Sequence, residues 1–137
     1  MVKELEFKIN GDSRGRLIAV ESEKDVPFII ERIFYIYGAD NSSVRGCHAN
    51  RKSEFVLINV SGKSKVLVDD GRGNRKIYVL DKPNKGIYIP RMYWKEMFDF
   101  SNDAVLLVLS NERYDSKEYI RSYDMFLNLV NEGTVLK

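Results

Sequence analysis

The fold is indicated most strongly by RGCHANRKSE, which occupies positions 45–54 of the chain. Residues i and i+2 of a β-strand project to the same face, so His48 and Asn50 would point together toward one side of a sheet. An apolar run follows at residues 55–60, and a glycine turn separates it from a second run at residues 65–68. The polar side chains of this region therefore lie on a strand that belongs to a larger β-structure.

Further short strands are predicted on both sides of this region. Each is an alternating or apolar run that ends at Gly, Asn, Asp or Ser, or begins at Pro. The predicted strands are residues 5–9, 16–21, 27–37, 55–60, 65–68, 76–80, 86–90, 96–100 and 104–110. Many short strands at near-regular spacing are typical of a β-barrel or sandwich. The pattern predicts an all-β fold and a single domain over residues 1–137.

The C-terminal segment has a helical pattern instead. Asp115 and Glu118 form a capping pair, and apolar residues then recur on one helical face. These residues are Tyr119, Ile120, Tyr123, Phe126, Leu127 and Val130. We expect one α-helix over about residues 116–132, packed against the barrel.

The composition excludes several classes of protein. Hydrophobic residues make up 44% of the chain and charged residues 31%, and the net charge is only +2, without the basic stripe of a nucleic-acid-binding protein. The single cysteine, Cys47, excludes an intrachain disulfide. Residues 1–10 lack the apolar core of a signal peptide, and the longest apolar run, residues 104–109, is too short to span a bilayer. We expect a cytoplasmic protein that binds neither nucleic acid nor membrane.

The region around His48 resembles the first cupin motif, in which two histidines one residue apart and a following glutamate point into a barrel. The second cupin motif, a glycine, a proline and then a histidine, resembles residues 86–95, where Lys95 occupies the histidine position. A cupin metal site needs about three imidazoles and a carboxylate, but the chain has one histidine, and a protonated lysine has no lone pair to offer. We therefore expect a small cupin, or jelly-roll, barrel without a metal, whose chemistry is acid–base.

Segments along nearly the whole chain resemble one family of this fold, the dTDP-4-keto-6-deoxyglucose 3,4-ketoisomerases of deoxyamino-sugar biosynthesis. The matching segments are residues 12–15, 27–35, 45–49, 69–71, 94–97, 100–101, 104–110 and 114–121. The resemblance implies an isomerase that needs no cofactor, removes the proton at sugar carbon 3, passes through an enediol and returns a proton at carbon 4. It also implies a thymidine-diphosphate sugar as substrate and a homodimer whose N-terminal strands are exchanged between subunits.

The resemblance also implies roles for particular side chains. The reaction needs a base near neutral pKa and a donor to the developing enolate oxygen, and these roles correspond to His48 as base and Tyr35 as acid or relay. Arginines suit the diphosphate because their forked donors match phosphate geometry. The expected substrate-binding residues are Arg14, Arg32, Arg45, Asn50, Lys95, Glu96 and Arg121.

Asn50 departs from the family, because most members have a second histidine there, which is a leading candidate for the carbon 3 base. Either His48 carries the proton transfer with Tyr35, or activity is weakened or lost and the chain is a sugar-nucleotide-binding regulatory or scaffold subunit. Lys95 is a further candidate base if burial lowers its pKa. The Arg14-Gly15 pair resembles the branch with a galacto (fucose-type) product, on a route to a surface glycan such as the lipopolysaccharide O-antigen. An isomerase acting on a different nucleotide sugar is a further alternative.

Overall fold

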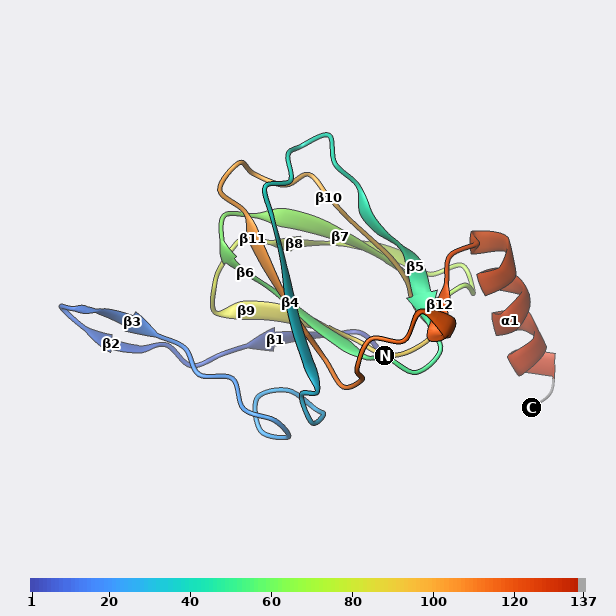
Figure 1. Ribbon diagram of the computed structural model, residues 1–137, viewed down its shortest axis with the longest axis horizontal. Helices are drawn as coiled ribbons and strands as arrows, with labels where there is room; N and C mark the ends of the chain where they lie inside the picture. The colour runs from blue at the N-terminus through green and yellow to red at the C-terminus, as the bar shows by residue number, and fades with distance from the viewer. Residues whose placement is uncertain (136–137) are drawn as a thin grey trace.

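The structure, a computed structural model, describes residues 1–135, which form two five-stranded antiparallel sheets, a projecting hairpin and a C-terminal helix (Figure 1). The first sheet has the strand order β1 (Lys3–Glu6), β9 (Lys85–Ile89), β6 (Phe55–Ser61), β11 (Val105–Ser110) and β4 (Arg32–Tyr37). The second sheet has the order β12 (Tyr119–Ile120), β5 (Arg45–Asn50), β10 (Trp94–Phe98), β7 (Ser64–Asp69) and β8 (Arg75–Leu80). The hairpin consists of β2 (Asn10–Asp12) and β3 (Gly15–Leu17). The prediction of a mostly β, cupin-like fold with a C-terminal helix is confirmed.

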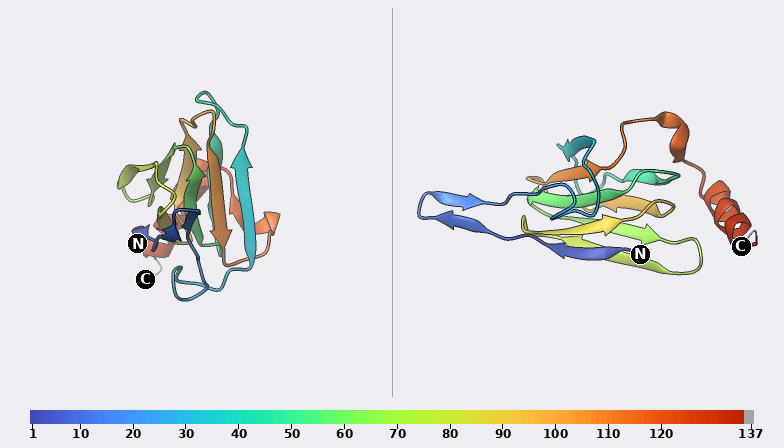
Figure 2. Two further views of the ribbon diagram at one scale, coloured as in Figure 1. Left: turned by 90° about the vertical axis from the view of Figure 1, so that its left-hand side faces the viewer. Right: turned by 90° about the horizontal axis from the view of Figure 1, so that it is seen from below.

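The main core lies between the two sheets, which Figure 2 shows as two layers. Strands β6, β9 and β11 contribute apolar side chains from the first sheet, and β7 and β10 contribute them from the second. A second cluster covers the outer face of the first sheet, where Val26 and Phe28 from the segment before β4 pack on Val56 and Ile58. Strand β6 is therefore buried on both faces, which explains why residues 55–58 are all apolar rather than alternating.

The C-terminal helix begins later than the sequence predicts. The Asp115 side chain accepts a hydrogen bond from the Lys117 backbone N–H at 3.0 Å, but the turn that it caps is the 3₁₀ helix η1 (Ser116–Glu118), not an α-helix. Tyr119 and Ile120 then form β12, because the edge of β5 offers them backbone hydrogen-bond partners. The α-helix α1 runs from Tyr123 to Val135. The tertiary contact with β5 has overridden the local helical pattern.

Helix α1 covers the outer face of the second sheet. Phe126 and Val130 pack there against Ala49, Trp94 and Ile120. Because side chains alternate along β10, Trp94 faces this helix while its neighbour Lys95 faces the space between the sheets. No helix within residues 1–135 has the length and apolar character needed to cross a membrane.

The N-terminal hairpin projects from the barrel at the end opposite α1 (Figures 1 and 2). Strand β1 pairs with β9 of the same chain, whereas β2 and β3 pair only with each other. The hairpin is exposed along its length, including Leu17 at 60% exposure. Exchange of the N-terminal strands in a homodimer stays a prediction.

Candidate active site

A cavity of about 300 Å³ lies between the two sheets, at the lower end of the range for small-molecule sites. Strands β4, β5, β6, β10, β11 and β12 all contribute to its wall. The lining residues are Phe34, Tyr35, Ile36, Arg45, Gly46, His48, Phe55, Leu57, Lys95, Met97, Val108, Tyr119 and Arg121. The polar groups of this wall come mainly from the second sheet and the segment that follows β12.

His48 is aimed into the cavity by a β-bulge in β5. Lys95 of β10 is paired with His48, but the next residue, Glu96, is paired with Gly46, so Cys47 has no partner in the register. Gly46 and Cys47 both have positive φ, 85° and 57°, as expected of a bulge that begins with glycine. An extra residue at this point re-aims the strand, so His48 and Lys95 lie side by side across the β5–β10 pair.

Gly46 gives the first prediction. A Cβ at Gly46 would lie 3.0 Å from both the Lys95 carbonyl oxygen and the Met97 sulfur, whereas a Cβ at Gly73, where φ is also positive at 91°, would meet nothing within 4 Å. Both alanine substitutions should lose about 1–2 kcal/mol of unfolding free energy from the left-handed backbone. We expect Gly46→Ala to lose at least about 1 kcal/mol more, from overpacking. Urea unfolding of both variants measures the difference, and equal losses would contradict the steric role of Gly46.

The His48 imidazole sits in a desolvated and positively charged environment. Its ring packs edge-on against Tyr119 with centroids 4.7 Å apart. Its Nδ1 is buried without a hydrogen-bond partner among the described residues. Burial, together with the charges of Lys95 and Arg121, lowers the pKa of His48 to about 3. The ring is therefore neutral near pH 7 and has a lone pair with which to accept a proton.

Lys95 is the one lysine or arginine of the described residues whose whole side chain is buried, with 3% exposure. Its Nζ donates a hydrogen bond to Asn50 Oδ1 at 3.0 Å and lies 4.8 Å from the centre of the Phe55 ring. Burial lowers the pKa of Lys95 to about 7, although the nearby Glu118 carboxylate acts in the opposite direction. Near neutral pH this side chain can therefore both donate and accept a proton.

Asn50 joins Lys95 to the Glu118 carboxylate. Its Nδ2 donates to Glu118 Oε2 while its Oδ1 accepts from Lys95. Only this orientation of the amide is possible, because an ammonium has no acceptor and a carboxylate has no donor. Asn50 has no exposed surface and does not line the cavity. Asn50 therefore contacts Lys95 and Glu118 in this structure, and its role in substrate binding stays a prediction.

Glu118 is held rigidly by the backbone turn after β5. Its Oε1 accepts hydrogen bonds from the backbone N–H groups of Lys52 and Ser53, each at 2.9 Å, and its Oε2 accepts from the Ser53 hydroxyl at 3.0 Å. Burial alone would raise the pKa of Glu118, but these bonds and the one from Asn50 lower it below its usual value. The sequence identifies Glu118 only as part of a helix cap, because its contact with Asn50 depends on β12 pairing with β5.

The cavity wall is positively charged. Arg45 and Arg121 line it together with Lys95, and none of its lining residues is acidic. The Arg121 guanidinium lies 5.0 Å from the centre of the Tyr119 ring. Such an environment favours a ligand that carries phosphate.

Arg32 lies just outside the cavity wall, behind Tyr119. Its Nη1 donates to the Tyr119 hydroxyl at 3.2 Å, and its guanidinium packs on the rings of Phe34 and Phe55. Its Nε and Nη2 are buried without hydrogen-bond partners among the described residues. Two unused donors beside the cavity agree with a ligand-binding role.

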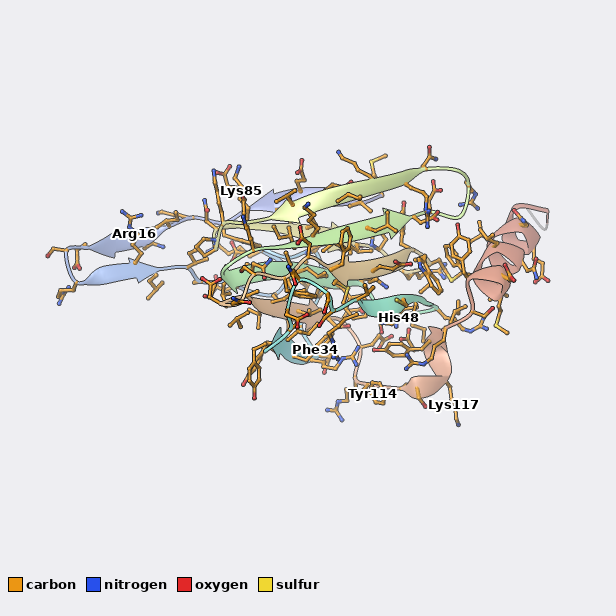
Figure 3. The ribbon with its side chains drawn as sticks, turned by 90° about the horizontal axis from the view of Figure 1, so that it is seen from above. Arg16, Phe34, His48, Lys85, Tyr114 and Lys117 are labelled. Atoms are coloured by element: carbon orange, nitrogen blue, oxygen red, sulfur yellow. The ribbon has the colours of Figure 1, made fainter. Side chains whose placement is uncertain are left out.

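Two predicted site residues, Arg14 and Glu96, lie away from the cavity, and a third, Tyr35, lies at its border. Arg14 is at the tip of the projecting hairpin, paired with Asp12, and Figure 3 places the nearby Arg16 far from His48. Glu96 faces α1 rather than the cavity, and its Oε2 accepts a hydrogen bond from Trp94 Nε1 at 2.9 Å. The side chain of Tyr35 is directed away from the core because it alternates with Phe34, which packs against the core, along β4.

Tyr35 borders the cavity, but its side chain is 62% exposed and its ring packs against that of Tyr37. This placement argues against the predicted acid role. Phe34, the neighbour of Tyr35 that packs against the core, lies on the same side of the molecule as His48 in Figure 3.

The side chains present do not fit a cupin metal centre. No group of three or more His, Cys, Asp or Glu residues within residues 1–135 is arranged to hold a metal ion. The only imidazole, His48, faces the Lys95 side chain rather than a second ligand. The cavity instead brings together two side chains that can exchange protons, His48 and Lys95, beside cationic groups.

Comparison with known proteins gives consistent matches over nearly the whole chain. Residues 1–131 match the protein family described as "FdtA: WxcM-like, C-terminal". The TDP-4-oxo-6-deoxy-alpha-D-glucose-3,4-oxoisomerase of Aneurinibacillus thermoaerophilus is 42% identical over 96% of this chain and 98% of its own length.

Two crystal structures from Campylobacter jejuni are also similar. The TDP-fucose-3,4-ketoisomerase WlaRA has a TM-score of 0.91 and 42% identity, covering 96% of both chains. The TDP-quinovose 3,4-ketoisomerase WlaRB has a TM-score of 0.89 and 43% identity, covering 93% of this chain and 97% of its own.

Proposed function

Since this chain belongs to the FdtA family, whose similar members are sugar-nucleotide 3,4-ketoisomerases, we propose that it moves the keto group of TDP-4-keto-6-deoxyglucose from carbon 4 to carbon 3. The observation that carries this proposal is that the His48 imidazole faces a cavity whose wall also holds Arg45, Lys95 and Arg121. A neutral imidazole can take the proton from carbon 3, and positive charge nearby stabilises the enediolate that forms. Family membership supports an enzyme over the alternative of a binding-only subunit.

The arginines on and beside the cavity wall support a nucleotide-diphosphate substrate. Arg45 and Arg121 lie on the wall, and Arg32 has two unused donors behind Tyr119. A cavity of about 300 Å³ is at the small end of the range for drug-sized ligands, so the sugar would occupy it and the diphosphate would lie toward Arg45 and Arg121. Arg14 could reach such a ligand only in a neighbouring subunit, through the strand exchange predicted for a homodimer.

We propose that the product has the galacto (fucose-type) configuration. The support is the resemblance of Arg14-Gly15 to that branch of the family. Sequence identity does not discriminate, because the fucose-type relative and the quinovose-type relative match this chain almost equally, at 42% and 43%.

The proposed function predicts a specific isotope pattern. The purified protein, mixed with TDP-4-keto-6-deoxyglucose in deuterated water, should yield a 3-keto product that carries deuterium at carbon 4. Proton NMR of the sugar measures both outcomes, and the coupling constants of an enzymatically reduced or aminated product distinguish galacto from gluco. Absence of exchange and of product above the protein-free background would contradict the proposed function.

A further inference from the structure

Three side chains form a continuous hydrogen-bonded chain from the cavity to the C-terminal segment. Lys95 faces the cavity, Asn50 accepts its hydrogen bond at 3.0 Å, and Glu118 accepts a hydrogen bond from the other end of Asn50. All three have at most 4% exposure. A lysine is almost never so deeply buried without a direct carboxylate partner, and no salt bridge to Lys95 occurs within residues 1–135. Stability therefore does not explain why Lys95 is buried at this position.

We propose that Lys95 is the second catalytic residue of the isomerisation, the group that protonates carbon 4, and that Asn50 and Glu118 are positioning residues that hold its Nζ in the cavity. The inference rests on the proposed function. Lys95 is the cross-strand neighbour of His48 on β10, so the two groups face the same part of the cavity. One substrate held there could contact both, with adjacent sugar carbons presented to adjacent side chains.

The proton transfers balance with two such groups. His48 takes the proton from carbon 3, the electrons of that bond form the carbon 3–carbon 4 double bond, and the carbonyl electrons move to the carbon 4 oxygen. The His48 imidazolium then returns its proton to that oxygen. The Lys95 ammonium gives a proton to carbon 4, and the resulting amine takes the proton that leaves the carbon 3 hydroxyl as the new carbonyl forms. Both side chains end in their starting states, with no other reactant needed.

The other polar groups of the wall are less suited to this step. The guanidinium groups of Arg45 and Arg121 are donors without an acceptor, so they can stabilise charge but are poorly suited to accept a proton. The Tyr119 hydroxyl accepts a hydrogen bond from Arg32 and is the remaining rival. Glu118 is the charged group that acts on Lys95, while Lys95 and Arg121 both act on the neighbouring His48. With a pKa of about 7, Lys95 is matched to proton transfer near neutral pH.

The test separates exchange at carbon 3 from formation of product. In deuterated water, Lys95→Met and Lys95→Arg should still exchange the carbon 3 hydrogen of recovered TDP-4-keto-6-deoxyglucose, while the 3-keto product falls by a factor of about 10²–10⁴. The arginine variant keeps the positive charge, so it should exchange faster than the methionine variant but form no more product. The inference is overturned if Lys95→Arg forms product within tenfold of the wild type, or if Tyr119→Phe rather than the Lys95 variants shows this separation. Failure of the proposed function itself would be recognised by a wild type that neither exchanges nor isomerises.

The role of Glu118 is tested by the pH profile of kcat. The Glu118 carboxylate raises the pKa of Lys95. In Glu118→Gln this pKa should therefore be lower, and the part of the profile in which kcat falls as Lys95 loses its proton should move to lower pH. Glu54→Gln is the matched control, since Glu54 is also a hydrogen-bonded carboxylate but its partners are Tyr88 and Asn111. The control should leave the profile in place even if it lowers stability. Equal shifts in both variants, or no shift in Glu118→Gln, would remove the positioning role.

Discussion

Replacing His48 by glutamine is expected to reduce both carbon 3 exchange and product formation by a factor of about 10²–10⁴, the usual contribution of a general base. A glutamine amide fills a similar space and can hydrogen-bond the sugar, but it cannot accept the carbon 3 proton. The loss should therefore fall on kcat, with little change in the affinity for substrate. Exchange of the carbon 3 hydrogen in deuterated water, followed by NMR, measures this step without interference from Lys95.

Two further measurements test whether a loss of activity in His48→Gln comes from unfolding or from a loss of nucleotide binding. The thermal midpoint of His48→Gln should stay near that of the wild type, because the glutamine side chain fills a similar volume at the cavity wall. Binding of thymidine diphosphate, measured by calorimetry, should also be retained. A folded, nucleotide-binding His48→Gln that still exchanges at the wild-type rate would show that the base lies elsewhere.

The architecture was predictable because its signals are local. Alternation and turn residues located most of the strands, including β6, β7, β8 and β11, within a few residues. The placement of His48 on a strand also followed from the alternating spacing, whereas the bulge at Gly46 and Cys47 that aims it was not predicted. Helix α1 was placed too early because Tyr119 and Ile120 suit a helix locally but gain backbone partners from β5. That competition depends on a contact between distant segments, which no local pattern contains.

The composition of the site was less predictable than the fold. Lys95 stood out because it occupies the histidine position of a motif, but its link through Asn50 to Glu118 joins β10, β5 and the segment before β12. Tyr35 and Glu96 were predicted from the family resemblance, but strand alternation directs Glu96 away from the cavity and leaves Tyr35 largely exposed at its border. An alternating strand therefore needs its register fixed by a structure before adjacent residues can be assigned to a site.

The buried ammonium should also have a large effect on stability. Lys95 has a pKa of about 7 in the folded protein against 10.5 for an unperturbed lysine, and each pKa unit corresponds to about 1.4 kcal/mol. Below pH 7 the side chain is protonated in both states, so the folded state bears the full desolvation penalty. Between pH 7 and 10.5 the unfolded state binds the extra proton, so the Lys95 contribution to stability rises with pH.

We therefore expect Lys95→Met to be more stable than the wild type, by about 1–4 kcal/mol below pH 7, as found when buried charges are replaced by apolar groups. The gain should shrink steadily as the pH rises from 7 toward 10.5, because the wild-type lysine is then neutral in the folded state. Urea unfolding of both proteins at pH 6, 8 and 10 measures the trend, with Lys65→Met as control, since Lys65 lies at the surface beside Asp99. A methionine variant that is less stable at pH 6, or a difference that does not vary with pH, would mean that the ammonium is well accommodated in the fold. A gain in stability together with a loss of product formation would instead identify Lys95 as a residue kept for catalysis at the expense of stability.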